Sequence, residues 1–239
     1  MTETMTFALI LIPCLIVAIV LHEVAHGWTA LALGDPTAKE RRRLSLNPIR
    51  HVDPVGTLLV PGALALFGGP VFGWAKPVPV NFNRLDNPRI GMMLVGAAGP
   101  AMNLLLATGA AIVLGASVAA GSAIGLAGNG LPTIVAPDGT TSLLGRGLVV
   151  FILINTFLAL FNLLPIPPFD GSHLVEGLLP RSMARHYARL RNVGMLLFVA
   201  LIAMTWAFPG AGILDRVIGP PVEWVLNQYL ALATLVAGA

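Results

Sequence analysis

The sequence contains little charge and almost no cysteine. Only 10% of its 239 residues are charged, against about 25% in an ordinary soluble domain, and 56% are hydrophobic. A soluble fold of this length could not bury so much apolar surface, so the composition indicates a membrane protein. The single cysteine, Cys14, excludes an intramolecular disulfide and a cysteine zinc cluster. We expect it to be a small apolar packing residue.

The positive charge is also small. The formal net charge is +3, and the basic residues are grouped in short segments between apolar stretches. This pattern is typical of residues that orient a membrane protein, so we expect a lipid bilayer and no nucleic acid as a partner. Under the positive-inside rule, residues 34–54, 72–89 and 181–191 are cytoplasmic and the N-terminus is outside.

Long apolar runs predict an all-α polytopic membrane protein with about four to six transmembrane helices. The main runs cover residues 5–33, 90–120, 148–164, 193–208 and 222–236, of which the last either spans the membrane or lies at its interface.

The stretch between the first and second long helices predicts a re-entrant or β-hairpin element. Residues 55–69 are apolar but too few to span easily. Residues 72–82 alternate in character but contain two prolines, which permit only an edge or loop strand. Residues 121–141 are predicted to form a loop.

The first apolar run contains an H-E-x-x-H motif, His22-Glu23-Val24-Ala25-His26. Residues i and i+4 share one face of a helix, so both imidazoles can bind one cation. The Glu23 carboxylate can then reach a metal-bound water, and zinc suits this ligand set. A chance match is the alternative, but ionisable residues inside a membrane helix are usually functional.

A catalytic zinc needs a third protein ligand and an open fourth position. The candidates are Asp170, His173, Glu176, His51 and Asp53. Asp170 is favoured because it lies in a proline-rich turn beside a glycine, and His173 is second. His51 and Asp53 are expected to shape a polar turn or to lie near the site.

Five segments together resemble the site-2 protease family of intramembrane metalloproteases. They are the H-E-x-x-H motif and NPIRHVDPVGT (47–57), GWAKPVPVN (73–81), AGPAMN (98–103) and NLLPIPPFDG (162–171). The resemblance implies that His22, His26 and Asp170 bind Zn²⁺ and that Glu23 is the catalytic acid/base. It also implies that Asn103 and Asn162 lie near substrate, although each could instead make an interhelical hydrogen bond.

The function implied by the resemblance is a zinc metalloendopeptidase that cleaves transmembrane or membrane-anchored proteins, as in regulated intramembrane proteolysis. We expect one membrane-embedded metalloprotease domain over residues 1–239, with a catalytic core over about 5–175 and additional C-terminal helices over about 185–236. We expect it in a bacterial-type plasma (inner) membrane, with its active site toward the cytoplasm. No PDZ-like domain is inserted between the helices, which leaves open how substrates are selected. The oligomeric state is also open.

Two other functions fit the sequence less well. A membrane metal-ion transporter would place polar residues along successive helices, whereas residues 90–120 and 193–208 offer few beyond Asn103. A catalytically silent scaffold would lack some of the expected site residues, and all of them are present. We also expect residues 72–82 to pair with an extended substrate as an added strand.

Overall fold

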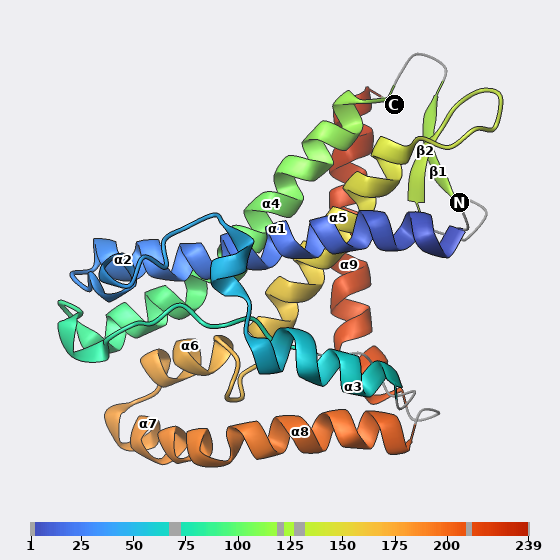
Figure 1. Ribbon diagram of the computed structural model, residues 1–239. Coiled ribbons are helices and arrows are strands. Elements are labelled where there is room, and N and C mark those ends of the chain that lie inside the picture. The colour runs from blue at the N-terminus through green and yellow to red at the C-terminus, as the bar shows by residue number, and fades with distance from the viewer. Residues whose placement is uncertain (1–2, 67–72, 119–121, 127–131, 209–211, 239) are drawn as a thin grey trace. The chain divides into compact units, whose positions relative to one another are not determined.

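The computed structural model describes residues 3–66, 73–118, 122–126, 132–208 and 212–238 (Figure 1). The parts of the predicted segments at 67–69, 72, 119–121 and 127–131 lie outside these residues. The longer helices are α1 (Glu3–Ala32), α4 (Pro88–Ala116), α5 (Leu143–Asn162), α8 (Arg191–Ala207) and α9 (Ile213–Ala237). This confirms the all-α polytopic fold predicted from the apolar runs.

Shorter elements connect the long helices. The α-helices are α2 (Thr37–Glu40), α3 (Val60–Leu66), α6 (Gly171–Leu178) and α7 (Arg181–Tyr187). The 3-10 helices are η1 (Pro48–His51), η3 (Phe82–Arg84) and η4 (Ala188–Leu190), and η2 (Pro54–Leu59) is a π-helix.

Four helical stretches among the described residues are long and apolar enough to cross a membrane. They are Met5–Ala32, Pro88–Ala116, Leu143–Asn162 and Arg181–Thr205, which runs through α7, η4 and α8. Helix α9, which contains the last predicted apolar run, is not among these four.

The one described β-hairpin lies between α4 and α5, over residues predicted to be a loop. Strands β1 (Ala123–Leu126) and β2 (Pro132–Val135) pair antiparallel, with Ile124 opposite Ile134. The prediction of a plain loop was therefore wrong, since four-residue strands are too short to show alternation. No strand forms over residues 73–81, although a hairpin is one of the elements predicted between the first two long helices.

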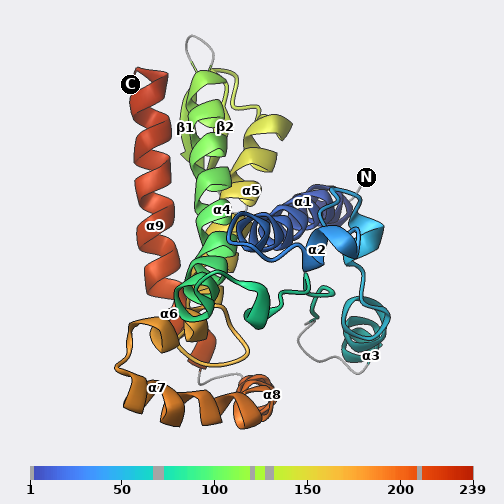
Figure 2. The same cartoon turned by 90° about the vertical axis from the view of Figure 1, so that its left-hand side faces the viewer.

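The chain divides into two compact units. The first contains residues 1–18, 103–160 and 218–239, and the second contains 19–102 and 161–217. In the first unit α9 runs alongside the second half of α4 (Figure 2). A Cβ on Gly115 would lie 2.2 Å from the Ala233 carbonyl oxygen, so this approach requires glycine.

The core of the first unit consists mostly of small and aliphatic side chains. Ala107, Ala111 and Leu114 of α4 pack with Val149 and Ile152 of α5. Cys14 is half-buried beside this helix pair, and its thiol lies 3.8 Å from the Gly147 carbonyl oxygen.

In the second unit, a fully buried carboxylate fixes the end of α1 to the extended segment 73–81. Asp35 accepts hydrogen bonds from the backbone N–H of Thr37 (3.0 Å) and of Asn81 (2.6 Å). Burial alone would raise the pKa of Asp35, but these bonds and the Thr37 hydroxyl hold the pKa below its ordinary value. Asp35 therefore stays ionised and holds the segment that lies beside the H-E-x-x-H motif.

Candidate metal centre

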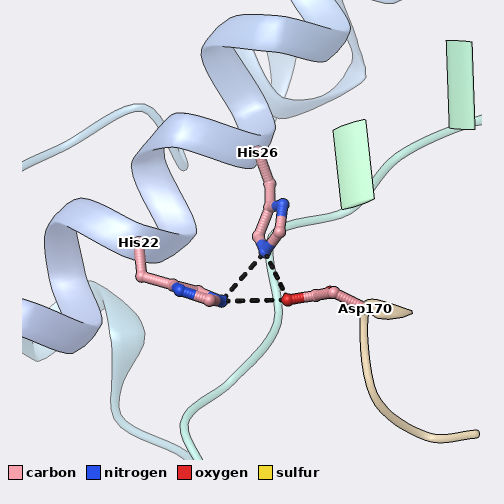
Figure 3. A group of neighbouring side chains, drawn as sticks. All are labelled: His22, His26 and Asp170. Atoms are coloured by element: carbon pink, nitrogen blue, oxygen red, sulfur yellow. Dashed lines mark hydrogen bonds and ion pairs between the residues drawn. The ribbon is translucent and has the colours of Figure 1, made fainter. Parts of the chain in front are cut away.

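Three side chains far apart in the sequence converge in the second unit (Figure 3). The Asp170 Oδ2 atom lies 3.2 Å from His22 Nε2 and 3.3 Å from His26 Nε2. The two Nε2 atoms are 3.1 Å apart. Both histidines are buried, at 6% and 8% exposure, so these three ligand atoms face one another away from bulk solvent.

Local geometry places each of the three. His22 and His26 are one turn apart on α1, which is why both imidazoles project from the same face. Asp170 is the N-cap residue of α6, yet its side chain makes no capping hydrogen bond and is directed at the histidines instead. The turn before it is tight, because a Cβ on Gly171 would lie 2.2 Å from the Leu163 carbonyl oxygen.

The arrangement fits a metal ion better than a hydrogen-bonded triad. Asp170 Oδ2 is buried but accepts no well-directed hydrogen bond from the described residues. Zn–N and Zn–O bonds of about 2.0–2.2 Å at tetrahedral angles place ligand atoms about 3.3 Å apart, close to the separations found here. The residues present therefore fit zinc.

The surroundings orient the ligands. His26 Nδ1 lies 2.6 Å from the Val95 carbonyl oxygen, which requires the proton on Nδ1 and leaves the Nε2 lone pair for a metal. Burial alone would raise the pKa of Asp170, but positively charged imidazoles of His22 and His26 hold the pKa well below its usual range, and a bound cation would act in the same direction. The carboxylate is thus in its ionised, metal-binding form.

Helix α4 closes one side of the centre with glycine. A Cβ built on Gly99 would lie 2.5 Å from His26 Nε2 and 2.6 Å from His22 Nε2. A Cβ on Gly96 would lie 3.0 Å from the Asp170 carbonyl oxygen. The space beside the two imidazole nitrogens therefore exists because residue 99 has no side chain.

Glu23 is held by the backbone of the extended segment. Its Oε2 atom accepts a hydrogen bond of 2.8 Å from the Val78 N–H. Among the described residues, Oε1 accepts no hydrogen bond, so one carboxylate oxygen is positioned and the other is available.

The other predicted ligands lie in different surroundings. Glu176 forms an ion pair with Arg191, and His173 lies one turn along α6 from Asp170. His51 Nε2 lies 2.7 Å from the Ser45 carbonyl oxygen, and Asp53 accepts from the N–H groups that begin η2. His51 and Asp53 thus shape a polar turn, one of the two roles expected for them.

Asn103 lies in the first unit and is fully buried. Its side-chain amide donates to Asn155 Oδ1 (2.8 Å) and to the Ala18 carbonyl oxygen (3.3 Å). Asn162 ends α5 and is half-buried. A substrate-binding role for either asparagine stays a prediction.

Sequence reasoning missed four contributors to these contacts. They are the Val95 carbonyl, the Val78 N–H, the bare backbone of Gly99 and the Asn155 amide. Only Asn155 carried a usable signal, as a polar residue within an apolar run.

Comparison with known proteins identifies the family. A sequence model of peptidase family M50 matches residues 10–205. The chain belongs to peptidase family M50. The predicted resemblance to site-2 proteases is thereby confirmed.

Similar proteins agree with this membership. YwhC of Bacillus subtilis (strain 168), named as a zinc metalloprotease, is 37% identical over 80% of this chain and 78% of its own length. Rip2 of Mycolicibacterium smegmatis, also named so, is 28% identical over 78% of this chain and 64% of its own. Rip2 of Mycobacterium tuberculosis (strain H37Rv) is 28% identical over 81% of this chain and 68% of its own. No solved structure matches this chain.

Membership in family M50, together with the apolar helices, makes this protein an integral-membrane metalloprotease that uses zinc. The cofactor predicted from the H-E-x-x-H motif is therefore confirmed.

Proposed function

We propose that this M50 protein is an intramembrane endopeptidase of the HExxH type, with His22, His26 and Asp170 as zinc ligands and Glu23 as general acid/base. The observation that carries the proposal is the convergence of three ligand atoms within 3.3 Å of one another, two of them on the same turn of α1 as the positioned carboxylate of Glu23.

Zinc held by His22, His26 and Asp170 would lower the pKa of a bound water to about 7 and would polarise the scissile carbonyl. Glu23 takes the proton from the attacking water and returns it to the leaving amine. The Val78 N–H fixes Oε2 during both transfers, so Oε1 is the oxygen that carries the proton. Gly99 leaves room beside the imidazoles for the reacting groups.

The substrates we propose are transmembrane or membrane-anchored proteins. A transmembrane helix hides its carbonyls in its own hydrogen bonds, so its cleaved stretch must become extended first. Residues 73–81 offer an extended edge with which the cleaved stretch of the substrate could pair. The N–H groups of Trp74, Lys76 and Val78 all bond inward, to Gly56, His51 and Glu23.

In an extended chain, successive residues point their backbone groups to opposite edges. The backbone groups of residues 75, 77 and 79 therefore point away from the contacts just described. On this outer edge Ala75 keeps an N–H, whereas Pro77 and Pro79 offer carbonyls alone. An incoming substrate strand would therefore pair mainly by donating its own N–H groups to this edge.

The basic residues of 34–54 and 72–89 support an orientation with these loops in the cytoplasm and the N-terminus outside. His22 and His26 lie in the second half of α1, toward those loops. We propose that the active site opens to the cytoplasm of a bacterial-type inner membrane.

Metal transport gains no support. Among the described residues, His22, His26 and Asp170 form the one cluster of this kind, whereas a transport path needs several.

Replacing Glu23 by Gln tests the proposal. The amide oxygen can still accept from the Val78 N–H, so the fold and the zinc content should be unchanged. Cleavage of a transmembrane substrate in detergent or liposomes should fall by about 10² to 10⁴, the usual contribution of a general acid/base. Unchanged cleavage would refute the assignment.

A further inference from the structure

A cavity of about 730 Å³ lies in the second unit, and none of the three proposed zinc ligands lines it. Its size is within the range of about 300–1,000 Å³ typical of small-molecule sites. The lining residues come from the extended segment, η3, α4, α6, α7, η4 and α8. The proposed proteolytic chemistry uses none of them.

The cavity is strongly basic. Four arginines line it, Arg89, Arg181, Arg185 and Arg191, against one carboxylate. That carboxylate, Glu176, forms an ion pair with Arg191.

Arg181, Arg185 and Arg89 have N–H donors left for a ligand. In the part of the chain that the structure describes, the side chains of Arg181 and Arg185 have no hydrogen bond or ion pair. Arg89 donates through Nη2 to the Leu179 carbonyl oxygen, while its Nε is buried without a partner. The cavity therefore has donors for an anion and lacks an internal counter-charge for them.

Apart from the imidazole of His173, the remaining lining is apolar. Val80, Phe82 and Met92 form one part, and Ala184 and Ala188 another. A small inorganic anion has no apolar surface to bury against these side chains, whereas the glycerol and first methylenes of a lipid have such surface.

The position of the cavity also suits a lipid. Helices α7 and η4 form the first part of the apolar stretch Arg181–Thr205, so their arginines mark the polar end of a candidate membrane span. If this stretch spans the bilayer, the cavity would lie at the depth of phospholipid headgroups.

We propose that this cavity binds a phosphate ester, with Arg181 and Arg185 as the principal donors. Arginine binds phosphate through paired N–H groups, and basic pockets beside membrane helices bind anionic headgroups. The mixed lining favours the headgroup of an anionic phospholipid over a soluble phosphate compound. An occupant would join α7 to α6, the helix that begins next to Asp170.

Lipid retention measured by native mass spectrometry tests the site. The full-length protein, purified in a neutral detergent, is titrated with phosphatidylglycerol or with phosphatidylcholine. The Arg181→Gln/Arg185→Gln variant removes two exposed charges that have no partner among the described residues. The Arg41→Gln/Arg189→Gln variant removes two exposed charges outside the cavity and is the matched control. Zinc content and melting temperature report whether each variant is folded.

Phosphatidylglycerol should bind more tightly than phosphatidylcholine. Its affinity should fall roughly 25-fold in the first variant, about fivefold for each arginine, and little in the control. Competition with millimolar inorganic phosphate distinguishes the sources. If inorganic phosphate does not displace the bound lipid, the cavity is a site for lipid headgroups. If inorganic phosphate displaces it, the cavity is a site for soluble phosphate compounds. Equal binding of the two lipids, or equal affinity in both variants, would overturn the proposal.

Discussion

Replacing Gly99 by Ala should empty the metal centre while leaving the fold in place. The added methyl would lie 2.5 Å from His26 Nε2 and 2.6 Å from His22 Nε2, whereas ordinary contact begins at 3.4 Å. The two nitrogens would have to move by about 0.9 and 0.8 Å, the difference between these distances. Metal–ligand distances tolerate only about 0.2 Å.

The expected loss of zinc affinity is at least about 100-fold, or about 2.7 kcal/mol, because weaker perturbations of outer contacts already cost 10- to 100-fold. Helix propensity favours alanine over glycine, so the loss could not be ascribed to a weaker helix.

Gly109→Ala is the matched control. It lies on the same helix, and its added methyl would meet nothing within 4 Å. Zinc content after dialysis against a zinc buffer, measured with cleavage activity, compares the two variants. If Gly99→Ala binds zinc and cleaves as well as Gly109→Ala, the described packing of α4 against the histidines is incorrect.

Two further predictions concern substrate contacts. Ala75→Pro removes the N–H from the outer edge of the extended segment and should impair cleavage of transmembrane substrates more than of unstructured peptides, whereas Pro77→Ala, which adds an N–H there, should not. Val78→Pro is a poorer test because it also removes the donor to Glu23. An equal loss of cleavage of both kinds of substrate in Ala75→Pro would contradict strand pairing. Asn103→Ala should lower the free energy of unfolding by about 1 kcal/mol, non-additively with Asn155→Ala, because the two amides bond to each other. A raised KM with unchanged stability would instead support a substrate contact.

The residues that converge in the candidate metal centre were predictable because their signal is local. The spacing of His22 and His26 fixes their shared face on any helix. Asp170 followed from the chemistry of a carboxylate in a rigid turn, although the sequence alone left His173 as an alternative. The long helices were predictable for a similar reason, since lipid demands long apolar runs.

The remaining features depend on packing between distant segments. The Val95 carbonyl and the Val78 N–H are backbone groups that any residue type supplies, so no sequence pattern marks them. Gly99 was visible as part of a small-residue helix, but its contact with the imidazoles was not. The hairpin at 123–135 was missed because its short strands carry no clear alternation.

The most direct test of the metal centre is the zinc content of the purified protein and of its Asp170→Ala variant. The unmodified protein should contain one zinc per chain, and the variant should lose it while remaining folded in detergent. A metal-free protein, or an Asp170→Ala variant that holds zinc as firmly as the original, would contradict a centre built from His22, His26 and Asp170.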